Sequence, residues 1–180
     1  MKIIIAGAGK IGYSVADILT AEGHDITVID NDSTRINNLS NNLDVICVEG
    51  SATNSETLLE AGAAEADLLM AATRSDETNM VCGISARKLG TKHVIARIRD
   101  TAYLRQTDFL REALGLSVIV NPEYECAKEI SRILRFPSAI RVDAFSKGSA
   151  EMIEHRVREG GKLDGVQLKH LPQRFDAKVL

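Results

Sequence analysis

Three glycines near the amino terminus have the spacing of a phosphate-binding turn, Gly7-x-Gly9-x-x-Gly12. The motif follows an apolar run that predicts a buried strand and precedes a sequence typical of a helix, and this context makes it specific. Gly7 permits the tight turn, Gly9 lets a pyrophosphate approach the main chain, and Gly12 lets helix and strand pack closely. The free N–H groups at the start of the helix favour phosphates. We therefore expect a nucleotide at the turn formed by Gly7, Ala8, Gly9, Lys10, Ile11 and Gly12.

Asp30 ends the second predicted strand, at the place expected for the acid that accepts hydrogen bonds from the adenosine ribose. Its charge repels a 2′-phosphate, which favours NAD over NADP, although the nearby Arg35 offsets part of this effect. ATP and ADP carry the same ribose hydroxyls as NAD. Asp30 therefore predicts an adenine nucleotide and leaves NAD(H), ATP and ADP open as ligands.

Polar segments follow three further predicted strands, at residues 49–52, 72–77 and 97–100. We expect them to line the same crevice, because ligands of open α/β sheets bind beyond the carboxyl ends of the strands. Two alternative roles are predicted for Thr73 and Ser75: they bond the ligand, or they cap the helix that follows. Arg97 is expected to pair with a phosphate, with a surface salt bridge as the alternative.

No histidine is well placed for the proton transfer that a dehydrogenase needs. The histidines are expected at the wrong ends of strands or in the last part of the chain: His24, His93, His155 and His170. Tyr124 and Lys128 have the Tyr-x-x-x-Lys spacing of short-chain dehydrogenases, but that family spaces its glycines differently. The chain is thus predicted to be a nucleotide sensor and not an enzyme. The alternative is an NAD-dependent oxidoreductase whose substrate domain lies outside this sequence.

Short apolar runs alternate with amphipathic stretches over most of the chain. The predicted strands cover residues 3–6, 26–29, 45–48, 68–71, 93–96 and 117–120, and the predicted helices begin near residues 11, 35, 56, 75, 101 and 122. The helix that begins at residue 101 is expected to run to residue 114. This alternation is typical of a doubly wound, mostly parallel α/β sheet of the Rossmann type.

The regular alternation stops at Phe136 and Pro137. Residues 139–145 and 152–157 predict two strands joined through Lys147 and Gly148, which indicates a change of architecture. We therefore expect a Rossmann domain over residues 1–136 and the beginning of a small α+β domain over residues 137–180. Residues 177–180 resemble a strand that has just begun, so a longer protein is expected.

Composition narrows the possible partners. The net charge is −3, and the chain has no block of Lys and Arg, which argues against a nucleic-acid partner. No apolar segment approaches the roughly 18–20 residues that cross a bilayer, so direct membrane insertion is not expected. Cys47, Cys82 and Cys126 are predicted to be buried, reduced thiols of a cytoplasmic protein.

Several segments together resemble one known family. They are the glycine turn with Asp30, residues 50–53 (Gly-Ser-Ala-Thr), 61–63 (Ala-Gly-Ala), 73–80 (Thr-Arg-Ser-Asp-Glu-Thr-Asn-Met), 95–99 (Ile-Ala-Arg-Ile-Arg) and 121–123 (Asn-Pro-Glu). The combination is similar to the RCK (KTN) domains of regulatory subunits of Trk/Ktr potassium-uptake systems. It covers roughly the first 135 residues, and the rest resembles, more loosely, the small domain that follows RCK domains.

This resemblance implies a cytoplasmic protein that binds NAD(H), ATP or ADP and assembles into homo-oligomeric rings. These rings lie under a membrane-embedded potassium-translocating subunit. It implies nucleotide contacts from the glycine turn and from Asp30, Ser51, Thr73, Arg74 and Arg97. Ser51 departs from the commoner Gly-Asp-Ala-Thr pattern, which puts an acidic role at that position in doubt. Lys10 stands where some relatives have an arginine, and it keeps the charge without the bidentate fork.

Overall fold

The computed structural model describes residues 1–135, 139–145 and 150–170. The chain forms two compact units, Met1–Glu125 and Cys126–Leu180. The first contains the glycine turn and Asp30.

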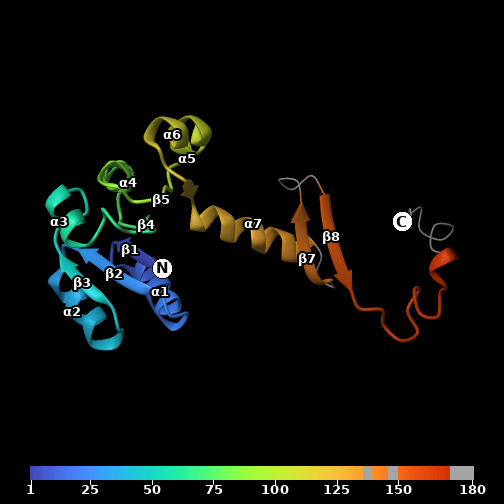
Figure 1. Ribbon diagram of the computed structural model, residues 1–180. Helices are drawn as coiled ribbons and strands as arrows, with labels where there is room; N and C mark the ends of the chain where they lie inside the picture. Colours follow the sequence, from blue (N-terminus) through green and yellow to red (C-terminus); the bar gives the residue numbers. More distant parts are fainter. Residues whose placement is uncertain (136–138, 146–149, 171–180) are drawn as a thin grey trace. The chain divides into compact units, whose positions relative to one another are not determined.

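The first unit is built on a parallel six-stranded sheet with the strand order β3-β2-β1-β4-β5-β6 (Figure 1). Its strands are β1 (Lys2–Ala6), β2 (Asp25–Asp30), β3 (Ile46–Glu49), β4 (Leu68–Ala71), β5 (His93–Arg97) and β6 (Val118–Val120). β1 pairs with β2 on one side and with β4 on the other. This order confirms the predicted Rossmann fold, and its reversal beside β1 creates the crevice where such sheets bind ligands.

Helices connect the strands. They are α1 (Lys10–Ala21), α2 (Ser33–Asn42), α3 (Ser55–Glu60), α4 (Asp76–Leu89), α5 (Thr101–Leu104), α6 (Thr107–Leu114) and α7 (Pro122–Arg135). Side chains accept hydrogen bonds from main-chain N–H groups at the start of four of them: Asp32 caps α2, Asn54 caps α3, Ser75 caps α4 and Asp100 caps α5. Such caps satisfy main-chain donors that have no partner within the helix.

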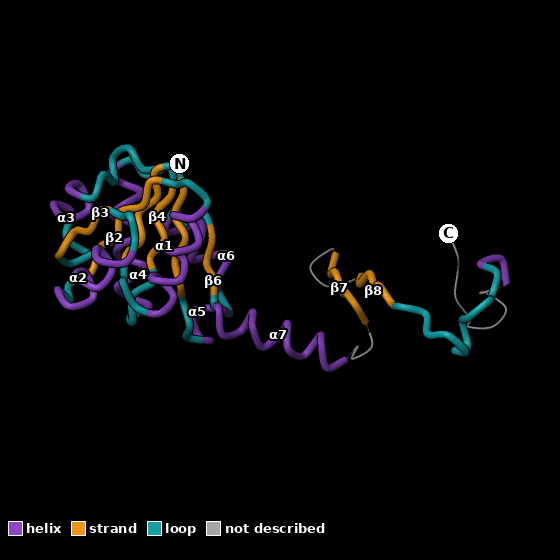
Figure 2. The backbone as a smooth tube through the Cα atoms, turned by 90° about the horizontal axis from the view of Figure 1, so that it is seen from below, coloured by secondary structure: helices purple, strands orange, loops and turns teal. Residues whose placement is uncertain are grey.

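The continuous apolar run of β1 is explained by burial on both of its faces. Ile3 and Ile5 pack in one core with Ala16 of α1 and Leu39 of α2. Ile4 and Ala6 pack in the opposite core, to which α3 and α4 contribute buried side chains such as Leu58, Cys82 and Ala86. Figure 2 shows the strands together as one layer with helices around it. The sheet is therefore covered on both faces, as parallel sheets require.

The prediction of one helix over residues 101–114 was wrong. The structure has two helices, α5 and α6, separated at Arg105 and Gln106. The hydroxyl of Thr107 donates a hydrogen bond of 2.7 Å to the carbonyl oxygen of Leu104. A threonine side chain that bonds a nearby carbonyl competes with the helical main-chain pattern, which accounts for the break.

The second unit contains an antiparallel pair, β7 (Ala139–Phe145) and β8 (Ala150–His155), and a short 3-10 helix, η2 (Leu168–His170). The hairpin agrees with the predicted change of architecture. The predicted link through Lys147 and Gly148 and the predicted strand at residues 177–180 lie outside the described residues.

The expectation of three buried cysteines holds in part. Cys82 is buried, Cys47 is partly buried, and Cys126 is exposed, so the prediction was wrong for Cys126. Burial raises the pKa of the Cys82 thiol to about 12. Within the described ranges, no helix has the length and apolar character needed to span a membrane.

Candidate functional site

Two adjoining cavities lie at the carboxyl ends of the central strands, with volumes of about 400 and 850 Å³. The first is lined by the ends of β1, β2 and β3 and by the β4–α4 turn, and the second by the start of α1, the β4–α4 turn, Arg97 and Glu123. Gly9, Arg35, Thr73 and Arg74 line both. The two cavities therefore share a wall of residues, and their sizes lie within the range of small-molecule sites.

The glycine turn is held between the neighbours of β1. The N–H of Gly7 donates to the carbonyl of Ile29 in β2 at 2.7 Å, and the N–H of Ala72 donates to the carbonyl of Ala6 at 2.8 Å. Gly7 has a φ of +108°, a conformation that side chains rarely adopt. A Cβ on Gly12 would lie 1.8 Å from the carbonyl oxygen of Gly7, so this glycine is required by packing.

Neither a positive φ nor close packing requires glycine at position 9. Its φ is −72°, which any residue adopts, and a Cβ built on it meets no atom within 4 Å. The space that this Cβ would enter is the open space of the two cavities, since Gly9 lines both. The fold therefore does not explain why residue 9 is glycine, whereas close approach of a ligand to the main chain does.

The amino terminus of α1 is suited to binding an anion. Gly9 provides no side-chain acceptor as the N-cap, and the first turn of α1 contains no acidic residue. The first N–H groups of a helix have no partner within it and carry a partial positive charge. Lys10 and Ile11, the first two residues of α1, line the second cavity. This end of the helix can therefore accept phosphate oxygens.

Asp30 is buried beside this turn, with 7% of its surface exposed, and is not the solvated loop residue that an unliganded turn would contain. One of its oxygens accepts from the N–H of Ala8 at 2.6 Å, and the other accepts from the N–H of Asp32 at 2.9 Å. An ionised carboxylate offers about four acceptor positions, so some remain for ribose hydroxyls. Asp30 thus organises the turn while it lines the first cavity.

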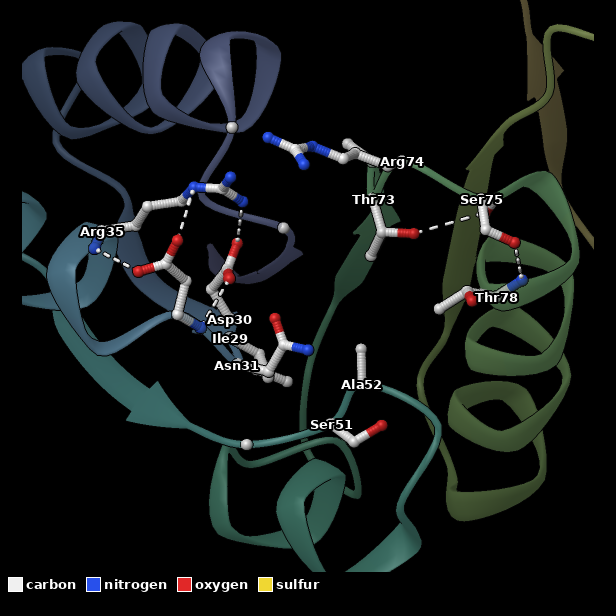
Figure 3. Close-up of a pocket in the computed structure, with 15 residues that line it drawn as sticks. Ile29, Asp30, Asn31, Arg35, Ser51, Ala52, Thr73, Arg74, Ser75 and Thr78 are labelled. Carbon is white, nitrogen blue, oxygen red and sulfur yellow. Dashed lines mark hydrogen bonds and ion pairs between the residues drawn. The ribbon is translucent and has the colours of Figure 1, made fainter.

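Arg35 borders both cavities beside Asp30. Its guanidinium lies 3.5 Å from an oxygen of Asp30 and 3.3 Å from an oxygen of Asp32. Across the first cavity lie Thr73 and Arg74, and the guanidinium of Arg74 extends toward the side occupied by Arg35 (Figure 3). Ser51 and the buried Ala52 form a further wall.

The structure decides in part whether Thr73 and Ser75 cap α4 or are available to bond a ligand. The hydroxyl of Ser75 accepts from the N–H of Thr78 at 3.1 Å and donates to Glu77 at 2.7 Å, so Ser75 caps α4. The hydroxyl of Thr73 donates to the side chain of Asn79 at 2.7 Å. Thr73 nevertheless lines both cavities.

The second cavity is strongly cationic. Basic side chains that line it are Lys10, Arg35, Arg74 and Arg97. Among the described residues, Glu123 is the acid in its wall, and it forms an ion pair with Arg97. Burial acts to raise the pKa of Glu123, but hydrogen bonds from the main chain and from Arg97 outweigh it and hold the pKa below its usual value.

Arg97 is 9% exposed, and one of its donors is unused. Its guanidinium donates to the carbonyl of Thr73 at 3.4 Å and to Glu123, while its buried Nε has no hydrogen-bond partner within the described part of the chain. A buried donor without a partner is costly. The surface salt bridge considered for Arg97 is therefore a half-buried pair inside the second cavity.

The structure brings the predicted site residues together around one crevice. Gly7, Asp30 and Ser51 line the first cavity, Ala8, Lys10, Ile11 and Arg97 the second, and Gly9, Thr73 and Arg74 both. Gly12 supports the turn from beneath. The geometry fits an extended adenine nucleotide, with a carboxylate for ribose, a helix start for phosphate and basic groups beyond.

Sequence reasoning gave no role to Asn79 and none to Glu123. Asn79 is fully buried and bonds to both Thr73 and Arg97. No pattern in the sequence marks Asn79, because it follows the polar residues 75–78 and reads as part of an exposed helix start. Within the described residues, no cluster of three or more His, Cys, Asp or Glu side chains is arranged to hold a metal ion.

The chain is similar in sequence to known proteins. Residues 3–122 match the family described as the TrkA-N domain. A Trk system potassium uptake protein TrkA homolog of Archaeoglobus fulgidus is 40% identical over 96% of this chain and 40% of its own length. The Trk system potassium uptake protein TrkA of Haemophilus influenzae is 37% identical over 100% of this chain and 41% of its own length. The chain thus spans about two fifths of the length of these relatives.

Solved structures share the fold. The TrkA-N domain of the Escherichia coli inner membrane protein ybaL superposes with a TM-score of 0.66 and is 25% identical, over 74% of this chain and 96% of that domain. The RCK domain of GsuK superposes with a TM-score of 0.62 and is 26% identical, over 76% of this chain and 28% of that one. Structures of the GsuK channel bound to NAD and of GsuK bound to ADP, each 22% identical, also match. With its Rossmann sheet, its glycine turn and a family match over residues 3–122, this chain belongs to the TrkA-N domain family.

Proposed function

We propose that this chain is the nucleotide-sensing part of a cytoplasmic regulatory subunit of a potassium-uptake system. It binds NAD(H) or an adenine nucleotide and controls a membrane-embedded potassium-translocating subunit. The observation that carries the nucleotide role is the open space around Gly9, where the main chain, the start of α1 and the buried carboxylate of Asp30 meet. The names of the relatives support the link to potassium uptake.

In the proposed complex the first cavity holds the adenosine half. Asp30 accepts hydrogen bonds from the ribose hydroxyls, while Ser51 and Ala52 border the adenine. The phosphates lie over Gly9 at the start of α1. The second cavity takes the other half of the ligand, where Lys10, Arg74 and Arg97 meet further phosphates or a second ribose. The NAD- and ADP-bound forms of GsuK support a site of this kind.

This arrangement limits how the ligand can act as a signal. A ligand shifts a conformational equilibrium only by its different affinity for the two states. NAD, ATP and ADP share their adenosine half, so Asp30 holds them about equally and does not discriminate. Discrimination must arise in the second cavity, from Lys10, Thr73, Arg74 and Arg97. A coupling of about 1–3 kcal/mol is enough for a regulatory response.

The proposed role needs no catalytic step. The residues that line the two cavities include no histidine in the part of the chain that the structure describes, and Tyr124 is not among them. An oxidoreductase would need a proton donor or base there, and Tyr13, which lines the second cavity, is the residue of that kind that an activity measurement must exclude. Incubating the full-length protein with NAD and a panel of hydroxy and amino acids should give no NADH, and steady NADH production would contradict this part of the proposal.

The binding role is tested by calorimetry of NADH, ADP and ATP with the full-length protein, and the transport role by potassium uptake in cells that lack the native subunit. We expect nucleotide binding by the wild type and its loss in Gly9→Ala, because the added methyl group occupies the space of the phosphates. Restored, nucleotide-dependent uptake with the wild type and not with Gly9→Ala would support both roles. Binding without any effect on uptake would contradict the transport role alone.

A further inference from the structure

Asn79 is fully buried in α4 beneath the two cavities. Its Oδ1 accepts two hydrogen bonds from Thr73, one from the main-chain N–H at 2.8 Å and one from the hydroxyl at 2.7 Å. Its Nδ2 donates to the carbonyl of Arg97 at 2.8 Å and to the carbonyl of Thr73 at 3.3 Å. One amide group therefore bonds to the ends of two neighbouring strands.

The orientation of this amide is fixed by its partners. A main-chain N–H can only donate and a carbonyl can only accept, so Oδ1 must face the N–H of Thr73 and Nδ2 must face the carbonyl of Arg97. Both amide hydrogens and two acceptor positions are in use, which satisfies the side chain. A buried polar group that is fully satisfied in this way rigidifies its surroundings.

The hydrogen bonds of Asn79 stabilise the region where β4 and β5 end. The ladder between β4 and β5 has its last registered pair at Ala71 and Ala96. Thr73 and Arg97 lie just beyond that pair, where the ladder no longer joins the two strands. Asn79 extends the connection past the end of the ladder, and the guanidinium of Arg97 returns to the carbonyl of Thr73 at 3.4 Å.

We propose that Asn79 is a positioning residue for the second cavity. By joining the ends of β4 and β5, it holds Arg97 so that the guanidinium is already aimed at the part of the ligand beyond its first phosphate. The inference rests on the proposed nucleotide-binding function. Its physical basis is preorganisation, because a side chain fixed before binding loses less freedom when the ligand arrives. Arg97 lines the second cavity, where its terminal guanidinium nitrogens already bond to Thr73 and Glu123.

The first experiment compares short and long ligands in the full-length protein. Asn79→Leu keeps the branched shape and removes every side-chain hydrogen bond. We expect its affinity for ATP and NAD to fall about tenfold, the loss of roughly one charge-assisted hydrogen bond. Affinity for AMP, which ends at the first phosphate, should change less than about twofold. An equal loss for AMP would show that Asn79 serves the fold in general and would overturn the inference.

A double-mutant cycle then asks whether Asn79 acts through Arg97. If it does, adding Asn79→Leu to Arg97→Ala causes no further loss of ATP affinity, because residues that act as one unit are not additive. Additive losses would overturn the inference. Cys82→Ala is the control for stability, since Cys82 is buried in the same helix without lining either cavity. It should lower the melting temperature and leave ATP affinity unchanged.

If Asn79→Leu does not fold, Asn79→Asp takes its place in both experiments. The carboxylate keeps the acceptor for Thr73 and loses the donors to the carbonyl of Arg97, so the same pattern of affinities is expected. If the wild type binds none of AMP, ATP or NAD, the proposed function itself fails and the inference fails with it. If the wild type binds them and the cycle is additive, the inference fails and the proposed function stands.

Discussion

The carboxylate of Asp30 is joined to the main-chain N–H of Ala8 by a hydrogen bond of 2.6 Å, across 22 positions of sequence. The acid at the end of β2 and the glycine turn after β1 therefore form one rigid element. The residue expected to bind the ribose also holds the loop expected to bind the phosphates. A change at Asp30 is consequently a change in both.

Replacing Asp30 by alanine should weaken the fold as well as ligand binding. Two main-chain N–H groups, of Ala8 and Asp32, lose their acceptor, and an unsatisfied buried donor costs about 1–3 kcal/mol. Urea denaturation should show this loss, and calorimetry should show weaker binding of NADH and ADP. Asp44→Ala removes an exposed acid that precedes β3, at the opposite end of the strands, and should change neither quantity. Equal affinity of wild type and Asp30→Ala would disprove the assignment of the ribose acid.

Alanine at Gly9 and at Gly12 should have opposite consequences. Gly9→Ala places a methyl group in open space, so the melting temperature should stay within a few degrees of the wild type while nucleotide affinity is lost. Gly12→Ala forces a Cβ onto the carbonyl of Gly7, so the protein should lose several kcal/mol or fail to fold. Thermal melting and calorimetry of both variants check the pair. Normal NADH binding by Gly9→Ala would contradict the inference that ligand binding requires glycine at position 9.

Lys10→Ala and Arg97→Ala should alter which nucleotide is preferred. Both side chains line the second cavity. In the proposed complex this cavity holds the part of the ligand in which ATP and NADH differ. Loss of one charged contact of about 1.5–3 kcal/mol should change the ratio of ATP to NADH affinity about tenfold or more. Potassium uptake of cells with the same variants is measured beside the affinities. If the variants no longer discriminate between ATP and NADH but potassium uptake is regulated as before, nucleotide discrimination in the second cavity does not control uptake.

The Arg97–Glu123 pair should lose its contribution in acid. The pKa of Glu123 is below its usual value, so the carboxylate stabilises the fold above the unfolded-state pKa near 4.3. This stabilisation disappears as the pH falls through the lower folded-state pKa. The melting temperatures of wild type and Glu123→Gln should therefore differ at pH 7 and converge toward pH 3. A difference that persists at pH 3 would show that Glu123 acts by another contact.

The chain should associate with itself through an apolar face of α7. Ile130, Ile133 and Leu134 lie on one face of this helix and are 53%, 59% and 73% exposed. A contiguous exposed apolar patch of this kind commonly marks an interface. Sedimentation should give species larger than a monomer at high micromolar concentration, and Ile133→Glu should shift them toward the monomer. A wild type that sediments as a monomer would contradict this expectation.

The apolar residues of α5 and α6 differ from those of α7. Leu104, Leu110 and Leu114 are half-buried, and Leu114 packs against the core of its own unit. An amphipathic pattern marks a face that is buried, but it does not say against what. The contrast with Ile130 and Ile133 became visible only with the structure.

The glycine turn and Asp30 could be predicted because their signals are local. A turn after an apolar run and an acid at the end of the next strand depend on neighbouring residues alone. Asn79 could not be placed in this way, because its partners Thr73 and Arg97 come together only when β4 pairs with β5. The ion pair between Arg97 and Glu123 depends likewise on where two distant segments meet. The break at Gln106 was missed because no Gly or Pro marks it.

The position of β1 between β2 and β4 also fixes when the site can exist during synthesis. A growing chain that has made only β1, α1 and β2 already holds the glycine motif and Asp30, but this is one wall of the crevice. The opposite wall, with Thr73 and Arg74, arrives only after β4 has emerged and paired with β1. A nucleotide therefore has nothing complete to bind on the nascent chain, and it acts instead on the finished sheet. There it favours, by mass action, the pairing of β1 with β4 that created its site.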